Sequence, residues 1–198
     1  MIKVCGMRDA ENICQVEALG IDMMGFIFYP KSSRYVSKHP EYLPTKCKRV
    51  GVFVDEDIEQ VKHIAEEFAL DLIQLHGSES PEYAQRLRDW KVIKAFNIAT
   101  KEDLEATKPY EGLVDYFLFD TKGKSAGGNG EKFNWNVLSN YKDNTPFLLS
   151  GGIGPDDAGR VKVFQHPKCV GIDLNSRFEI EPGIKDIVKL KTFLNYGK

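Results

Sequence analysis

Two side chains of this sequence have the chemical types that proton-transfer chemistry uses. Cys5 ends the short run 2–5, and Asp120 ends the apolar run 116–120. A thiol and a carboxyl group act as general base and general acid when their surroundings adjust their pKa. A free cysteine is also commonly a buried, inert residue, and aspartate often caps a helix. The chemistry therefore depends on whether the fold brings both groups to one cavity.

The segment 150–154 (Ser-Gly-Gly-Ile-Gly) has the composition of a phosphate-binding turn. Glycine lets the backbone approach an anion, and a helix that starts behind the turn presents free N–H groups. Pro155 is suited to open such a helix, although an ordinary tight turn also favours glycine. Polar residues end the next apolar run and strengthen the interpretation. The residues expected to bind substrate here are Gly151, Gly152, Asp173, Asn175 and Ser176.

Three further polar residues follow or end apolar runs. Arg34 lies in a polar loop, where a guanidinium can hold a carboxylate through two parallel hydrogen bonds. Gln74 and His76 alternate at the end of another run, so they point to the same side of a strand. Each also has a structural interpretation, as a solvated arginine or as groups that only make structural hydrogen bonds. As site residues, all three are expected to bind substrate.

Gly127 and Gly128 lie in a Gly-Gly-Asn-Gly run inside the long loop 121–133. Because no helix clearly opens behind this run, it is expected to act as an active-site lid over the substrate rather than as a nucleotide loop. The remaining three histidines fall in predicted loops or helices, and the cysteines form no Cys-x-x-Cys pair. No metal site is therefore expected.

The elements that must position these residues are short apolar runs alternating with longer segments. There are eight runs, at 2–5, 23–28, 49–54, 71–75, 91–97, 116–120, 146–150 and 170–174. Strands separated by helical segments indicate βαβ units and a parallel sheet. We predict one α/β domain over 1–198, a closed (β/α)8 TIM barrel with parallel strands; an open doubly wound sheet is the alternative. The chain is shorter than the usual ~250 residues, so most loops must be short.

The alternation of side chains along each strand predicts where the polar groups point. If Val4 faces the helices, then Lys3 and Cys5 face the barrel interior. By the same rule, Leu118 and Asp120 point inward. The residues that share inner faces on other strands are Gln74, His76, Asp173 and Asn175. The polar groups thus converge at the carboxyl end of the barrel, where the active sites of such barrels lie.

The segments between the runs carry helix signals of different strength. Apolar residues recur at helical spacing over 58–68, and Ser80 before Pro81 has the form of a helix N-cap. A last helix is expected over 184–194. The weakest unit is 39–44, which is expected to form a short or broken helix.

Composition excludes several classes of function. The 198 residues carry 27 Lys and Arg against 29 Asp and Glu, which gives no electrostatic drive toward nucleic acid or a membrane surface. The 42% hydrophobic content is too high for a disordered chain, and no apolar stretch reaches membrane-spanning length. Four scattered cysteines fit a reducing compartment, so a cytoplasmic protein is expected. The expected partner is a small phosphorylated molecule, and the expected state is a monomer rather than a homodimer.

The ordered motifs together resemble the phosphoribosylanthranilate isomerase family of tryptophan biosynthesis. They are KVCGM at 3–7, GFIF at 25–28, SSR at 32–34, VGVFV at 50–54, QLHGSE at 74–79, DT at 120–121, GGNG at 127–130, FNW at 133–135, SGGI at 150–153, DLNSRFE at 173–179 and PGIKD at 182–186. The resemblance implies a (β/α)8 barrel. It also implies an Amadori rearrangement of an aminoaldose phosphate to an aminoketose phosphate without any cofactor.

For this chain, the resemblance implies that Cys5 is the general base and Asp120 the general acid. It also implies that Arg34 binds the carboxylate of the anthranilate. The loops after the seventh and eighth strands resemble the family's phosphate site. The family often has Pro at position 33 and usually reads Ser-Ser-Gly at 175–177, whereas this chain has Ser33 and Asn-Ser-Arg. Whether Arg177 reaches the phosphate is left open.

The chemistry makes demands on both groups, because an ordinary thiol (pKa about 8.5) is protonated and an ordinary Asp (about 3.9) is ionised at neutral pH. Lys3 and nearby helix N-termini are expected to favour the Cys5 thiolate. Other sugar-phosphate barrels are alternatives, but epimerases need histidine and aspartate ligands at several strands, and indole-glycerol-phosphate synthase needs lysines at strand ends. A non-catalytic phosphosugar-binding barrel would need neither Cys5 nor Asp120.

Overall fold

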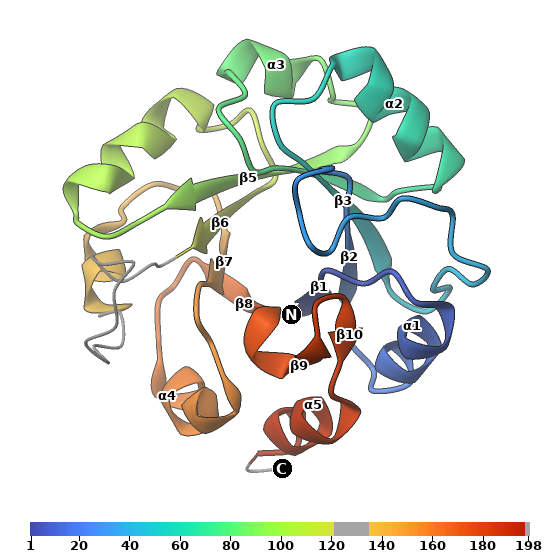
Figure 1. Cartoon of the computed structure of the whole chain (residues 1–198). Helices are drawn as coiled ribbons and strands as arrows, with labels where there is room; N and C mark the ends of the chain where they lie inside the picture. The colour runs from blue at the N-terminus through green and yellow to red at the C-terminus, as the bar shows by residue number, and fades with distance from the viewer. Residues whose placement is uncertain (121–134, 197–198) are drawn as a thin grey trace.

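The structure, a computed structural model, describes residues 1–120 and 135–196. Within these residues, parallel strands pair in chain order and the last pairs with the first, which closes a barrel (Figure 1). The strands are β1 Ile2–Cys5, β2 Met23–Ile27, β3 Lys48–Phe53, β4 Leu72–Leu75, β5 Lys91–Asn97, β6 Tyr116–Asp120, β7 Phe147–Ser150 and β8 Cys169–Leu174. The predicted (β/α)8 barrel is confirmed, and every predicted strand boundary lies within one residue of the observed one.

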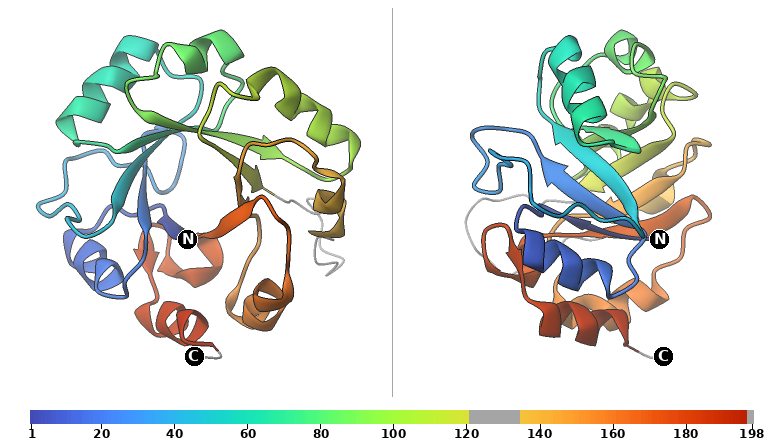
Figure 2. Two further views of the ribbon diagram at one scale, coloured as in Figure 1. Left: turned by 180° about the vertical axis from the view of Figure 1, so that it is seen from behind. Right: turned by 90° about the vertical axis from the view of Figure 1, so that its right-hand side faces the viewer.

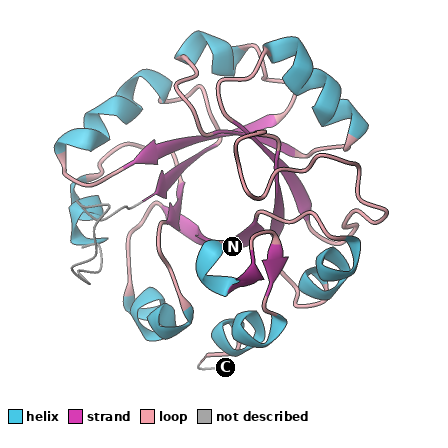
Figure 3. Cartoon of the chain, viewed as in Figure 1, coloured by secondary structure: helices cyan, strands magenta, loops and turns pink. Residues whose placement is uncertain are grey.

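Short helices cover the outside of the barrel (Figure 3). They are α1 Ala10–Glu17, α2 Ile58–Glu67, α3 Pro81–Gln85, α4 Ala158–Val163, α5 Ile187–Leu194 and the 3-10 helices η1 Glu102–Tyr110, η2 Trp135–Asn140 and η3 Pro155–Asp157; a further short 3-10 helix, η4 Ser176–Phe178, follows β8. The predicted helix over 58–68 is confirmed as α2, capped by Asp57. Ser80 caps α3 by accepting a hydrogen bond from the N–H of Tyr83, as predicted. Among the described helices, none combines the length and the apolar character that crossing a bilayer requires.

The expected short or broken helix over 39–44 is not formed, and the chain between β2 and β3 runs without one. The Glu17 carboxylate, at the end of α1, holds this connection instead. Its Oε1 accepts hydrogen bonds from the N–H groups of Thr45 and Lys46, each at 2.5 Å, and its Oε2 accepts one from the Tyr42 hydroxyl. These contacts satisfy donors that a helix would have paired internally.

An antiparallel hairpin, β9 Glu179–Glu181 and β10 Ile184–Lys185, is inserted between β8 and α5. The last helix therefore begins at Ile187, and the expectation that it starts at 184 is wrong. Proline and glycine at 182–183 turn the chain here, and Gly183 has φ of +91°, which favours glycine. Seen from the side, the hairpin lies at the end of the barrel away from the N-terminus (Figure 2, right).

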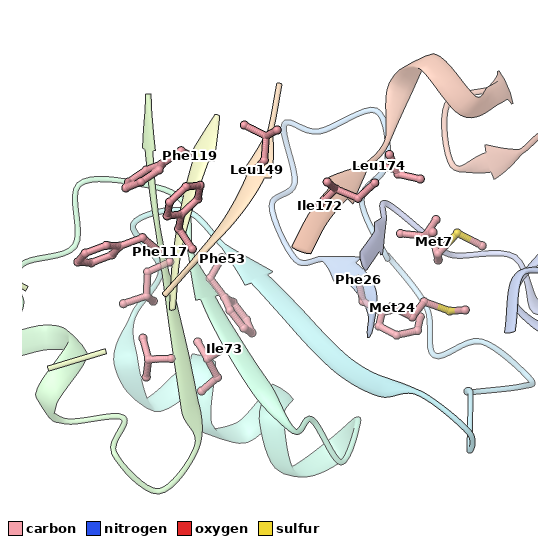
Figure 4. Packing of buried hydrophobic residues seen from close by; sticks show 14 of the residues in the cluster. Met7, Met24, Phe26, Phe53, Ile73, Phe117, Phe119, Leu149, Ile172 and Leu174 are labelled. Atoms are coloured by element: carbon pink, nitrogen blue, oxygen red, sulfur yellow. The ribbon is translucent and has the colours of Figure 1, made fainter. Parts of the chain in front are cut away.

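Buried apolar side chains form two layers, as the alternation predicts. Phe117 and Phe119 belong to the outer layer between strands and helices (Figure 4). Leu118, between them, belongs to a smaller cluster inside the barrel. The members of that inner cluster are Met23, Val50, Leu72, Ile93, Ala95, Leu118 and Leu148. The apolar inner cluster fills the barrel, and the inward-facing polar groups of the site lie at the carboxyl ends of the strands.

Candidate active site

A cavity of about 520 Å³ opens at the carboxyl ends of the strands. Nine residues predicted for the site line it: Cys5, Gln74, His76, Asp120, Gly151, Gly152, Asp173, Asn175 and Ser176. Arg34 is not among the lining residues, and Gly127 and Gly128 lie outside the described residues. The thiol and the carboxyl group thus share one cavity, although they come from β1 and β6.

Glycines make room around the Cys5 thiol. A Cβ atom at Gly25, on the neighbouring strand β2, would lie 2.6 Å from Cys5 Sγ. Gly6, directly after Cys5, has φ of +79°, and a Cβ there would lie 2.6 Å from Arg34 Cδ. Larger residues at these two positions would displace the thiol or the arginine.

A buried ion pair lies next to Cys5 in the barrel interior. Lys3 Nζ donates to Asp173 Oδ1 at 2.9 Å, and Ser150 Oγ donates to Asp173 Oδ2 at 3.3 Å. Burial raises the pKa of the Cys5 thiol; Lys3 opposes this rise and Asp173 adds to it. Lys3 therefore favours the Cys5 thiolate, as expected, but burial outweighs the lysine and the net pKa of the thiol is raised.

His76 lies between Gln74 and Asp120. Gln74 Nε2 is 2.9 Å from His76 Nδ1, and His76 Nε2 is 4.0 Å from Asp120 Oδ2, too long for a direct hydrogen bond. Burial lowers the pKa of His76, and Asp120 only partly opposes this. The imidazole is therefore neutral at neutral pH. When Gln74 donates to Nδ1, the ring proton is on Nε2 and faces Asp120.

Gln74 also carries a buried atom that needs a partner. Within the described part of the chain, its Oε1 is the buried side-chain atom that makes no hydrogen bond. A buried acceptor without a donor is unfavourable by about 1–3 kcal/mol, so such atoms in native sites commonly face a ligand or water.

The other side of the cavity has the shape of an anion site. Gly151 and Gly152 have φ of +92° and +66°, so the turn after β7 uses the left-handed conformations that glycine tolerates. Arg177 also lines the cavity, and its Nε would lie 3.3 Å from a Cβ atom at Gly154. The turn, Asn175, Ser176 and Arg177 together present backbone and cationic groups to one region.

The family model for N-(5'phosphoribosyl)anthranilate (PRA) isomerase matches residues 2–196. The chain belongs to this family. A phosphoribosylanthranilate isomerase of Parabacteroides distasonis is 54% identical over 202 residues, which cover 98% of this chain and 91% of the relative. The enzyme of Phocaeicola vulgatus is 52% identical over 200 residues and covers 100% and 98% of the two chains.

Solved phosphoribosylanthranilate isomerases have the same architecture. The Thermotoga maritima structure superposes with a TM-score of 0.82 at 31% identity, covering 98% of this chain and 96% of that one. A structure of the isomerase in complex with reduced 1-(o-carboxyphenylamino)-1-deoxyribulose 5-phosphate has a TM-score of 0.80 at 29% identity, covering 98% and 95%. The resemblance inferred from the sequence motifs is confirmed.

Two buried residues of this phosphoribosylanthranilate isomerase family member were missed by reasoning from the sequence. Glu179 binds Arg34 through both carboxylate oxygens, and Lys185 binds Glu179. Both residues belong to family motifs named above, and that membership was the sequence signal that could have marked them as site residues. Their partnership was not visible, because Glu179 lies 145 positions from Arg34. Among the described residues, no cluster of three or more His, Cys, Asp or Glu could hold a metal ion.

Proposed function

We propose that this chain is a phosphoribosylanthranilate isomerase that uses Cys5 as general base and Asp120 as general acid. It converts N-(5'-phosphoribosyl)anthranilate to 1-(2-carboxyphenylamino)-1-deoxyribulose 5-phosphate, a step of tryptophan biosynthesis. The observation that carries the assignment of roles is that both side chains open onto the same cavity. The glycine turn after β7 supports a phosphorylated substrate there.

Ring opening is the step assigned to Asp120. In its protonated form, it donates a proton to the ribose ring oxygen while the C1′–O bond breaks. The anilino nitrogen supplies the electrons, which leaves an open-chain iminium ion. A neutral His76 that accepts from Gln74 at Nδ1 carries its ring proton on Nε2, where it is placed to support the carboxylate that remains.

Deprotonation at C2′ is the step assigned to Cys5. The iminium draws electrons from C2′, so the substrate acidifies its own proton and supplies its own electron sink. Its positive charge also favours the thiolate, which burial disfavours in the protein alone. The Cys5 thiol then gives its proton to C1′ of the resulting enolamine, and the Asp120 carboxylate takes the proton of the 2′-hydroxyl. The ketone forms, and both side chains return to their initial protonation states.

Substrate binding is divided among the remaining groups. Gly151, Gly152, Asn175 and Ser176 hold the phosphate, with Arg177 beside them. Gln74 Oε1, the buried acceptor without a partner, receives a hydrogen bond from a ribose hydroxyl. Asp173 supports Lys3 and Cys5 from the cavity wall. Arg34 holds the anthranilate carboxylate, and Gly127 and Gly128 stay a prediction for the lid.

The test is turnover of freshly prepared phosphoribosylanthranilate, followed by loss of its fluorescence, with the product identified by mass and NMR spectroscopy. We expect rapid loss that depends on enzyme concentration, with formation of the aminoketose. Binding of the substrate with no acceleration over buffer would contradict an isomerase and leave a phosphosugar-binding barrel.

We further propose that the chain acts as one domain over 1–198, as a monomer, and in the cytoplasm. The four cysteines are free, which suits a reducing compartment. The large apolar side chains exposed on the described surface are few: Met1, Val163, Ile180, Val188 and Tyr196. A related Thermotoga maritima isomerase is described as dimeric, so sedimentation analysis over a range of concentrations decides between the two states.

A further inference from the structure

Arg34 is held by a buried network that the proposed chemistry does not itself require. Its Nε and Nη2 donate to Oε1 and Oε2 of Glu179 at 2.8 and 2.6 Å, the geometry of a bidentate pair. The Glu179 side chain is only 5% exposed, whereas that of Arg34 is 21% exposed. The pair therefore fixes one edge of the guanidinium, while Nη1 on the other edge makes only a long contact of 3.5 Å to Ser33 Oγ.

Glu179 is itself anchored from the other side. Lys185 Nζ, fully buried, donates to Glu179 Oε1 at 2.5 Å and to Asn175 Oδ1 at 2.9 Å. The N–H of Gly183 also donates to Glu179 Oε1. The backbone N–H and C=O of Lys185 both bond to the Asn12 amide, on α1. This chain of contacts links the carboxylate that holds Arg34 to Asn175 and, through Lys185, to α1.

The position of the network relates it to the reacting groups. The Arg34 stem crosses Gly6, the residue after Cys5, and a Cβ at Gly6 would also lie 3.4 Å from Lys185 Nζ. Asn175, bonded to Lys185, lines the cavity. Two cations share one carboxylate, so the network carries a net positive charge beside the cavity. An anionic group on the substrate complements that charge.

We propose that Glu179 is a positioning residue that selects for a carboxylate on the aromatic ring of the substrate. By occupying the Nε–Nη2 edge of Arg34, it presents the Nη1–Nη2 edge, which can take a carboxylate in two parallel hydrogen bonds. Lys185 holds Glu179 for this purpose. The inference rests on the proposed function, because it names how that site distinguishes phosphoribosylanthranilate from the same compound without its carboxylate.

The test compares kcat/KM for phosphoribosylanthranilate and for phosphoribosylaniline, which lacks the carboxylate. For Glu179→Gln, we expect KM for phosphoribosylanthranilate to rise about ten- to a hundred-fold, because a charge-assisted contact is lost. The kcat/KM for phosphoribosylaniline should change by less than about three-fold. The ratio of kcat/KM between the two substrates should therefore fall strongly. In an Arg34→Met background, Glu179→Gln should leave that ratio unchanged.

If Glu179 had a purely structural role, Glu179→Gln would lower kcat/KM equally for both substrates, and that result would overturn the proposal. Glu79→Gln is the matched control, because Glu79 is a buried carboxylate paired with Lys94 at 3.1 Å in a different loop. It should lower stability and leave the ratio unaltered. If Glu179→Gln does not fold, Glu179→Asp keeps the charge but shortens the side chain, and the same collapse of the ratio is expected.

Failure of the proposed function would look different. A wild-type protein that turns over neither substrate would remove the isomerase assignment. The positioning role would then be tested by calorimetry, which measures the affinity for reduced product analogues that carry or lack the carboxylate. Wild type should prefer the carboxylated analogue and Glu179→Gln should not. Equal preference in both proteins would overturn the inference.

Discussion

Lys3 Nζ and Asp173 Oδ1 lie 2.9 Å apart inside the barrel. Lys3 is two residues before Cys5 in β1, and both side chains point to the inward side of that strand. Burial lowers the pKa of Lys3, but Asp173 and Cys5 outweigh it, so the net shift is upward. The ammonium form of Lys3 is therefore favoured although the side chain is fully buried. A permanent positive charge is available to the Cys5 sulfur when it loses its proton.

Removing this lysine should be costly to the fold. We predict that Lys3→Met lowers the free energy of unfolding by about 3–5 kcal/mol, because it leaves a buried carboxylate without a counter-charge. Urea unfolding measures the loss. The double variant Lys3→Met with Asp173→Asn should recover part of it. If the double variant is no more stable than Lys3→Met alone, the pair is not coupled as described.

The Cys5 thiol should lose its proton only at high pH. Because burial raises its pKa above that of a free thiol, we predict that alkylation of Cys5 by iodoacetamide in the protein alone reaches half its limiting rate at a higher pH than alkylation of a free cysteine. Lys3→Met should move the midpoint higher still, because the lysine opposes the rise. Mass spectrometry separates Cys5 from Cys14, which is exposed and reports on the reagent. A midpoint near neutral pH would contradict the description.

Glu17 should make stability depend on acid pH. Burial acts to raise its pKa, but hydrogen bonds from Tyr42, Lys46 and Thr45 reverse this, and the net shift is below the ordinary 4.5. Its stabilising effect is therefore complete above pH 4.5 and is lost as pH falls through the lowered value. We predict that Glu17→Gln costs about 1–3 kcal/mol at pH 7 and much less at acid pH. Thermal unfolding at both values measures this, and a difference independent of pH would contradict it.

Ala69, directly after the last turn of α2, adopts a φ of +46°. The left-handed conformation costs a residue with a Cβ about 1–2 kcal/mol, while glycine loses about 0.5–1 kcal/mol in unfolded-state entropy. We predict that Ala69→Gly stabilises the protein by about 0.5–1 kcal/mol in urea unfolding. Ala65→Gly, inside α2, is the control and should destabilise. A loss of stability with Ala69→Gly would show that the turn needs the methyl group.

The barrel and most of the site were predictable because they follow from local patterns. Alternation placed Cys5 and Asp120 inward, and parallel strands bring their carboxyl ends together. What local patterns could not give are contacts between distant segments. Glu17 replaces the helix expected at 39–44, and the pairing of Arg34 with Glu179 depends on a hairpin of very short strands. The protonation of Cys5 depends on burial, which a sequence does not quantify.

The central claim is that Cys5 and Asp120 exchange protons with one substrate. The direct measurement is the rate of phosphoribosylanthranilate fluorescence loss with Cys5→Ala and with Asp120→Asn, alongside circular dichroism that shows the barrel is retained. Removing a general base or acid should slow turnover by about 10²–10⁴-fold in each variant, with substrate still bound. Near-normal turnover by either folded variant would contradict the role given to that residue.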